Sequence, residues 1–235
     1  MKYVFKVDTD DFAESPRKIF DNMSTMVCWH NRYTLGDEEF SSDYASSSIE
    51  AFAEYIDDKY SLGIIDDYLL SEYKRVWKWI RANIVCKPLY LYDHYGITMS
   101  AGSIDISKKG EVDIGNPFSC HWDSGCVGFA YVARDRALSE YGGNIFTKKI
   151  KDNCSSIIDE EVKEYDCYLV GDVFCLGVAE VEDEFDLNDI DVDSLDFDVC
   201  CGYYGREYLN DAIIDHATNH KTKEVCKYEI VGDVI

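Results

Sequence analysis

The chain has 235 residues, and its 46 acidic residues against 23 basic ones give a formal net charge of -23. Its length and 46% hydrophobic content suffice for one domain with a packed core, which excludes global disorder. The negative charge argues against direct binding to nucleic acid or to anionic membranes, because both require a basic footprint. The expected partner is a basic protein surface, a cationic ligand or a divalent metal.

In the first half of the chain, alternation predicts strands and helical spacing predicts helices. Ser47 with Glu50 forms a capping-box pattern at the start of the first helix, and Pro88 before LYLYD favours an extended strand. The predicted elements are strands at 3–7, 25–29, 97–100 and 103–107, helices at 47–60 and 66–84, and a turn at 108–110.

In the second half, helices and strands mix without regular alternation. The predicted elements are strands at 127–132, 167–181, 199–204 and 227–231, and helices at 133–141, 156–165 and 206–219. Gly142 and Gly143 end the first of these helices. The pattern predicts a single α+β domain, with a mixed or antiparallel sheet and about four to five helices. Residues 180–198 are expected to be an acidic loop or insertion.

The ten cysteines are expected to be reduced and mostly buried as small hydrophobic residues. The N-terminal stretch MKYVFKVDTDDF has no apolar signal core, and no stretch of about 18 apolar residues occurs. The sequence therefore predicts a cytoplasmic protein without membrane association. No cofactor is predicted.

The stretch FSCHWDSGCVGF at 118–129 combines turn residues with reactive side chains. The favoured interpretation is a turn at 123–125 that places Trp122 in the core. The alternative is a nucleophile, Cys120 or Ser124, although no Gly-x-Ser-x-Gly elbow surrounds that serine. Cys120, His121 and Cys126 match structural zinc patterns poorly, and no metal site is predicted.

Two further polar groups could belong to an active site. CWHNRYTLGD places Cys28, His30, Arg32 and Asp37 within ten residues, and an Asp-His pair stands at a predicted strand end. If these groups converge with the 120–126 loop, general acid-base chemistry is possible. The residues of this enzyme hypothesis are His30, Asp93, His94, Cys120 and Asp123.

Two other patterns favour structural interpretations. His216 and His220 lie one helical turn apart and could share a metal, but His216 lies near the stripe of Leu209 and Ile213, which favours a packed or a surface histidine. The aspartates at 189, 191 and 193 have calcium-loop spacing, but Ser194 and Cys200 stand where an EF-hand requires Gly and Glu. Loose divalent binding by this carboxylate-rich loop stays open as an alternative.

Four blocks carry a resemblance to known sequences: PLYLYDHYGITMS, PFSCHWDSGCVGF, TMVCWHNRYTLGD and CCGYYG. They resemble blocks of uncharacterised bacteriophage and mobile-element proteins of Gram-positive bacteria, and they cover under a third of the chain. That pattern has proline at His121 and a polar residue at Cys126, so these residues do not form a set shared with the family. The resemblance implies a phage or mobile-element setting in a host bacterial cell and supplies no reaction.

The segment EVEDEFDLNDIDVDSLDFD, residues 180–198, has ten acidic residues and no basic one. In a mobile-element setting, it suggests a counter-defence inhibitor that mimics DNA or RNA. Such a protein occupies a basic groove of a CRISPR effector or restriction enzyme. The expected partner-binding residues are Glu180, Glu182, Asp183, Glu184, Asp186, Asp189, Asp191, Asp193, Asp196 and Asp198.

Three alternatives stay open beside the inhibitor. The acidic segment could be a solvated loop without a partner, or the protein could be a nuclease or hydrolase built on the residues named above. The 18 tyrosines could also line a small-molecule or nucleotide pocket, although the chain has no Gly-rich phosphate-binding motif.

Overall fold

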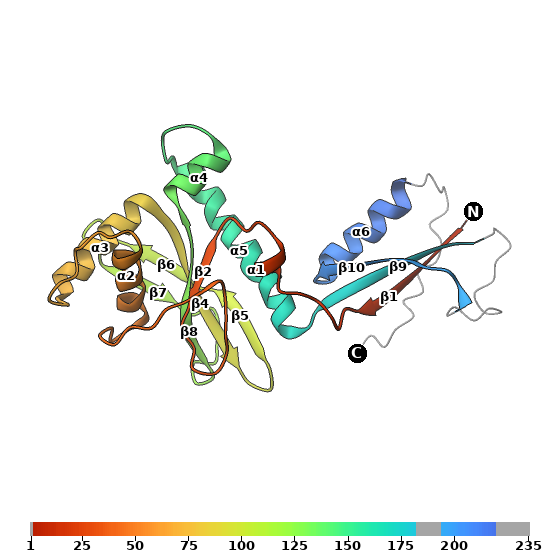
Figure 1. Ribbon diagram of the computed structural model, residues 1–235, viewed down its shortest axis with the longest axis horizontal. Helices are drawn as coiled ribbons and strands as arrows, with labels where there is room; N and C mark the ends of the chain where they lie inside the picture. Colours follow the sequence, from red (N-terminus) through yellow and green to blue (C-terminus); the bar gives the residue numbers. More distant parts are fainter. Residues whose placement is uncertain (1, 182–193, 220–235) are drawn as a thin grey trace. The chain divides into compact units, whose positions relative to one another are not determined.

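The computed structural model describes residues 2–181 and 194–219. The chain divides into two compact units: unit 1 is Met1–Ser15 with Cys167–Ile235, and unit 2 is Pro16–Asp166. Figure 1 shows helices and sheets in both. The predicted α+β class is confirmed, with six helices among the described residues. That the two units form one domain stays a prediction.

Unit 2 is built on a mixed five-stranded sheet in the order β3-β2-β8-β4-β5. The central strand β8 pairs antiparallel with β2 and β4, β4 pairs antiparallel with β5, and the short β3 is parallel to β2. Their bounds are β2 Thr25–Cys28, β3 Glu38–Glu39, β4 Ile84–Asp93, β5 Ile97–Ala101 and β8 Ser124–Ala133.

Helices α2 (Ser48–Lys59) and α3 (Leu70–Asn83) bury their apolar faces against this sheet. The Phe52 and Phe129 rings stack with centroids 4.3 Å apart, and Trp77 is buried beside them. The predicted cap of α2 is confirmed, because the Ser47 side chain accepts a hydrogen bond from the Glu50 amide.

Helix α3 begins later than the sequence predicts. The Glu72 carboxylate accepts hydrogen bonds from the amides of Asp66, Asp67 and Leu69, which ties residues 66–69 into a loop before the helix. At its other end, Ile84 already belongs to β4.

Strands β6 (Ser103–Ile106) and β7 (Val112–Gly115) form a hairpin around the predicted turn. Gly110 has φ +79°, and a Cβ there would lie 2.0 Å from the Lys74 carbonyl oxygen. The sequence did not predict β7. Apolar side chains of the hairpin pack against the core that α2 and α3 cover: Ile104, Ile106, Val112 and Ile114.

Helix α5 (Lys148–Val170) is much longer than the predicted 156–165. Ser156 is not its cap, because the hydroxyl donates to the Asp152 carbonyl within the helix. Residues 167–170 continue the helix instead of starting a strand, and Gly171, at φ +77°, follows its end. Figure 1 shows α5 across the sheet from α2 and α3, near α4 (Arg134–Tyr141) and α1 (Pro16–Ile19).

A buried ionic network joins α1, the β2–β3 loop and α5 in unit 2. The Arg17 guanidinium, 2% exposed, lies 2.9 Å from a Glu161 oxygen and 2.6 Å from an Asp37 oxygen. Burial lowers the pKa of Arg17, but hydrogen bonds and charge pairing with the two carboxylates outweigh burial and raise it. Arg17 is therefore a permanently charged tie between segments far apart in the sequence.

Unit 1 contains an antiparallel sheet in the order β1-β9-β10. Its elements are β1 Lys2–Thr9, β9 Val173–Val181, β10 Asp198–Tyr204 and α6 Arg206–Asn219. The bounds of α6 agree with the prediction. Leu209 and Ile213 of α6 pack on Phe5, Phe174 and Leu176.

His216 packs against β1, which is one of the two structural interpretations that the sequence left open. Its ring makes edge contacts with Tyr3 and Phe5, with centroids 5.8 Å apart in both cases. His220, the predicted strand at 227–231 and the aspartates of the calcium-like spacing lie outside the described residues.

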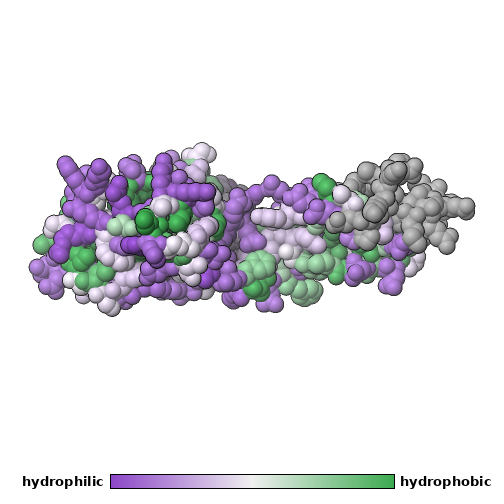
Figure 2. All heavy atoms as spheres, turned by 90° about the horizontal axis from the view of Figure 1, so that it is seen from above, coloured by the Kyte–Doolittle hydropathy of each residue, from purple (hydrophilic) through white to green (hydrophobic). Residues whose placement is uncertain are grey.

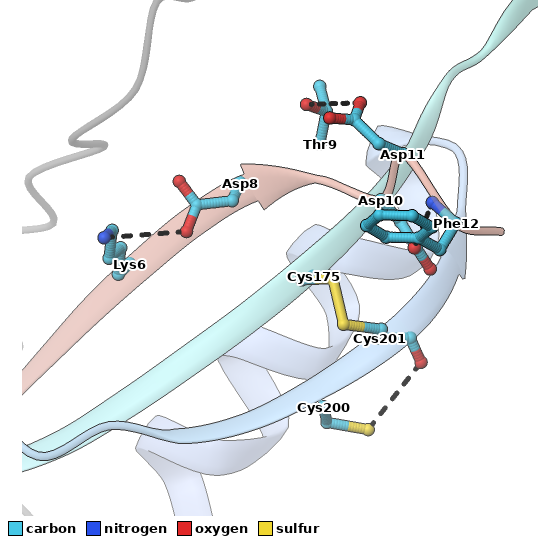
Figure 3. The surroundings of a disulfide bond; sticks show 9 residues. All are labelled: Lys6, Asp8, Thr9, Asp10, Asp11, Phe12, Cys175, Cys200 and Cys201. Carbon is cyan, nitrogen blue, oxygen red and sulfur yellow. Dashed lines mark hydrogen bonds and ion pairs between the residues drawn. A yellow bond between two sulfur atoms is a disulfide. The ribbon is translucent and has the colours of Figure 1, made fainter.

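The expectation that the cysteines are reduced is wrong for one pair. Cys175 of β9 and Cys201 of β10 are joined in a disulfide (Figure 3). They are directly paired residues in the antiparallel register, so their side chains extend from the same face of the sheet. Cys28, Cys86 and Cys154 are buried as expected, and burial raises the pKa of Cys28 and of Cys86 to about 12. The expectation that most cysteines are buried is wrong for the described residues, because Cys120, Cys126 and Cys167 are half-buried and Cys200 is exposed.

Candidate functional site

Two loops of unit 2 meet beyond the end of strand β4. The Asp93 amide donates a hydrogen bond of 2.8 Å to the Asp123 carbonyl oxygen, which joins the β4–β5 turn to the loop before β8. The turn is tight, since Tyr95 adopts φ +59°. This backbone contact brings the Asp93-His94 pair beside the 120–123 segment, as the enzyme hypothesis requires.

Asp123 is the shared partner of the two reactive side chains. The Cys120 thiol donates to Oδ2 of Asp123 at 3.4 Å, and Nδ1 of His94 lies 3.7 Å from the same oxygen. Nucleophilic catalysis by a cysteine normally uses a histidine as the base, oriented in turn by a carboxylate. Here the carboxylate stands between the thiol and the imidazole, so the order of contacts differs from that of a catalytic triad.

His30 joins this cluster indirectly. Its Nδ1 accepts the amide hydrogens of Arg32 and Tyr33, so the proton of a neutral ring is on Nε2. Tyr33 stacks on His30 at 5.0 Å and donates its hydroxyl hydrogen to Asp93, and Arg32 pairs with Asp93 at 2.9 Å. All five residues of the enzyme hypothesis therefore lie within one chain of contacts.

The remaining polar residues of the loop have structural roles. The Ser124 hydroxyl donates to the Cys120 carbonyl at 2.6 Å, and the Asn116 amide donates to Ser124 at 2.8 Å and lies 3.3 Å from Nδ1 of His121. These bonds fix the turn before β8. The hydroxyl of Ser124 is therefore held by structural hydrogen bonds, and within the described residues none of them joins it to a histidine.

Trp122 contradicts the prediction made for it. The stretch does form a turn, but the Trp122 side chain is 97% exposed instead of filling the core. The predicted turn residues Ser124 and Gly125 begin strand β8, which shifts the turn toward 119–123 and its tip outward. Cys126 lies further along β8, where burial raises its pKa.

A cavity of about 550 Å³ adjoins His30 but not the other residues of the enzyme hypothesis. Its polar wall comes from the serines of the β3–α2 loop, and its aromatic wall from Trp29, Tyr33 and Phe40. Asp93, His94, Cys120 and Asp123 are not among the lining residues. Of the five residues of the enzyme hypothesis, only His30 lines this cavity, which weakens the case for a substrate pocket at Asp123.

The predicted partner-binding residues fall into two groups. Glu180 at the end of β9 and Asp196 and Asp198 at the start of β10 are exposed. The others lie outside the described residues: Glu182, Asp183, Glu184, Asp186, Asp189, Asp191 and Asp193.

Helix α6 adds an acidic row that the sequence analysis did not select. Glu207, Asp211 and Asp215 are all exposed and recur every fourth residue. At 1.5 Å rise per residue, their Cα atoms follow one another at about 6 Å along the helix. The sequence could have predicted this row, because acidic residues recur every fourth position of the predicted helix on the face opposite Leu209 and Ile213.

Acidic charge is concentrated in unit 1. It contains 21 of the 46 acidic residues but six of the 23 basic ones, whereas unit 2 contains 25 acidic and 17 basic residues. Figure 2 shows hydrophilic residues over most of the visible face of unit 2, with small hydrophobic patches between them. Some acids of unit 2 form ion pairs with neighbouring bases, as Lys87–Asp159 and Lys59–Glu38 illustrate.

Comparison with family models, curated proteins and solved structures gives no match for this chain. Within residues 2–181 and 194–219, no helix is both long and apolar enough to cross a membrane.

Proposed function

We propose that the protein is a phage or mobile-element counter-defence inhibitor that acts in the host cytoplasm as a mimic of DNA or RNA. The acidic surface of unit 1 enters the basic groove of a nucleic-acid-processing enzyme such as a CRISPR effector or a restriction enzyme. The observation that carries this proposal is the unequal division of charge between the two units.

The physical basis is the similarity between clustered carboxylates and a phosphate backbone. Duplex DNA carries one negative charge per about 1.7 Å of axis, and its protein partners present matching cationic grooves. Carboxylates held on a helix or on strand ends present a comparable field to such a groove, with fast and salt-sensitive association.

The described part of unit 1 supports this account. The acidic row of α6 lies on a helix that is fixed to the sheet by Leu209 and Ile213, so its charges are held at regular intervals. Glu180 and Asp198 add exposed carboxylates on neighbouring strands, since Asp198 pairs with Val178 in the β9–β10 register.

The experiment compares two variants of equal net charge. The first neutralises four acids of unit 1, and the second neutralises four exposed acids of unit 2. The first set is Asp186→Asn, Asp189→Asn, Asp191→Asn and Asp193→Asn, and the control set is Asp43→Asn, Asp58→Asn, Asp105→Asn and Asp152→Asn. The readout is inhibition of DNA cleavage across a panel of purified restriction endonucleases and RNA-guided nucleases.

For an enzyme that the wild-type protein inhibits, the unit 1 variant should require at least about tenfold more protein for half inhibition, because four groove contacts lose their charge. The unit 2 variant should inhibit like the wild type. Wild-type inhibition by both variants would contradict the proposal. An equal loss of inhibition in both variants would also contradict it, because inhibition would then depend only on net charge.

A nuclease or hydrolase is the second candidate, favoured by the convergence of Asp93, His94, Cys120 and Asp123. The order of contacts around Asp123 and the position of the cavity both count against this candidate. The enzyme hypothesis is therefore supported less well than the inhibitor, which the charge division favours. His94→Ala and Cys120→Ala separate the two candidates in the same assays. Under the inhibitor account both variants keep full inhibition, whereas an effect that depends on catalysis by this cluster is lost in both.

A further inference from the structure

Unit 1 gathers an aspartate and two cysteines on one face of its sheet. Cys175 lies between Phe174 and Leu176, which pack toward α6, so its side chain extends from the opposite face. Cys201 pairs with it and shares that face. Figure 3 shows Asp10 beside this pair, after the end of β1.

The position of Asp10 follows from strand alternation. Asp8 pairs with Cys175 across β1 and β9, and Asp10, two residues later, returns to the same face. Its amide donates to the Val173 carbonyl at 2.8 Å, which continues the pairing beyond β1. A carboxylate oxygen of Asp10 and the sulfur atoms of Cys175 and Cys201 all lie within 4.8 Å of one another.

These three groups are suitable ligands for one metal ion once the disulfide is reduced. Zinc binds thiolates at about 2.3 Å and carboxylates at about 2.0–2.2 Å, so two sulfurs on tetrahedral zinc stand about 3.8 Å apart. Directly paired cysteines on neighbouring antiparallel strands can reach that separation by rotating χ1. The Phe12 amide donates to Asp10 Oδ1 at 3.2 Å and orients the carboxylate, whose oxygens keep further acceptor capacity.

We propose that Asp10, Cys175 and Cys201 form a zinc site in the reduced protein, and that the disulfide is the oxidised, metal-free state of the same site. A dithiol reductant delivers two electrons and two protons to the S–S bond, which gives two thiols and leaves the reductant as its own disulfide. Zinc then displaces the two thiol protons, and water completes the tetrahedral coordination.

The negative charge of unit 1 favours zinc binding at the reduced site. Its 21 acidic residues against six basic ones attract a divalent cation, and the three ligands supply three formal negative charges. The site is also accessible, because Cys201 is exposed and Cys175 and Asp10 are half-buried. This inference is independent of the proposed inhibitor function, since it concerns the ligands alone.

The neighbouring residues provide matched controls. Cys200 is exposed, and its sulfur contacts the Cys201 carbonyl oxygen at 3.9 Å instead of joining the three-ligand group. Asp11 is exposed next to Asp10 and contacts Thr9. Both controls change the same residue types at adjacent positions.

The test titrates Co²⁺, as a spectroscopic probe for zinc, into the full chain after reduction and removal of the reductant. The reduced wild type should bind one equivalent with a thiolate-to-cobalt charge-transfer band, and one equivalent of Zn²⁺ should bleach it. The oxidised protein should show no band. Cys175→Ser and Cys201→Ser should abolish the band, and Asp10→Asn should weaken binding by about tenfold or more. Cys200→Ser and Asp11→Asn should behave as wild type.

A reduced wild type without the band would overturn the proposal, as would a band that persists in Cys175→Ser or Cys201→Ser. Equal cobalt affinity of Asp10→Asn and Asp11→Asn would also overturn it, because the aspartate would not be a ligand. The aspartate comparison keeps both cysteines, so it decides the matter even if a cysteine variant fails to fold.

Discussion

Glu161 receives several hydrogen bonds from one distant segment of the chain. The Met23 amide donates to its Oε1 at 2.7 Å, and the Ser24 amide and hydroxyl also donate to the carboxylate. With Arg17 at 2.9 Å, these contacts satisfy a carboxylate that is 12% exposed. A buried charge of this kind is stable only while its partners remain, so the network makes unit 2 sensitive to the loss of any one of them.

Glu161→Gln should lower the free energy of unfolding by about 3 kcal/mol, because Arg17 keeps its buried charge but loses one of its two carboxylates. Glu160→Gln is the matched control: that residue is exposed on the same helix, and its effect should stay within about 0.5 kcal/mol. Urea unfolding measures both. A Glu161→Gln variant as stable as the control would show that the network contributes no net stability.

Strand β8 organises the sheet of unit 2 because it pairs with β2 on one side and with β4 on the other. Its Gly128 lies against Val27 and Cys28 of β2, where a Cβ would be 2.2 Å from the Val27 carbonyl oxygen. A Cβ at Gly125, at the start of the same strand, would meet nothing within 4 Å. The backbone of β2 therefore leaves no room for a side chain at Gly128, whereas Gly125 has room for one.

Gly128→Ala should destabilise the protein by about 2 kcal/mol or more, since backbone atoms of β2 must move to admit the methyl group. Gly125→Ala should change stability by about 0.5 kcal/mol or less. Thermal unfolding of the two variants checks this difference. Equal melting temperatures of the two variants would mean that the Val27 carbonyl oxygen does not lie close enough to Gly128 to exclude a methyl group.

Local sequence patterns predicted the bounds of some elements well. They failed where contacts between distant residues determine the structure. The bounds of α6 followed from an apolar stripe, and the start of α2 from the capping pattern at Ser47 and Glu50. Helix α5 was predicted too short at both ends. Its Glu161 and Asp166 accept hydrogen bonds from Met23 and Met99, long-range contacts that no local pattern contains. Burial raises the pKa of Asp166, although the Met99 amide and the Thr98 hydroxyl oppose that rise.

The same limit applies to the candidate sites. Asp93 and His94 were chosen as a local pair, but their approach to Cys120 and Asp123 depends on a backbone bond between two loops. The Cys175–Cys201 disulfide depends on a strand register with a bulge between Cys201 and Tyr203, which sequence spacing does not specify. Trp122 was predicted to fill the core beside a turn at 123–125, whereas the start of β8 at Ser124 places it at an exposed turn.

For the whole molecule, the division of charge is the property on which the proposed function depends. A net charge of -23 opposes folding by self-repulsion, and a value of about 2 to 8 would already be enough for solubility. Because the surplus is concentrated in unit 1, it is best explained by a function of that unit. Under the proposed function, the partner with complementary charge is a basic groove that normally binds polynucleotide.

The most direct measurement is a competition between this protein and duplex DNA for one inhibited nuclease. Binding of the labelled protein to the nuclease is titrated at several duplex concentrations and at low and high salt. The account predicts mutually exclusive binding: the apparent Kd for the protein rises in proportion to duplex concentration, and affinity falls steeply with salt. A ternary complex in which the duplex leaves the protein's affinity unchanged would contradict it.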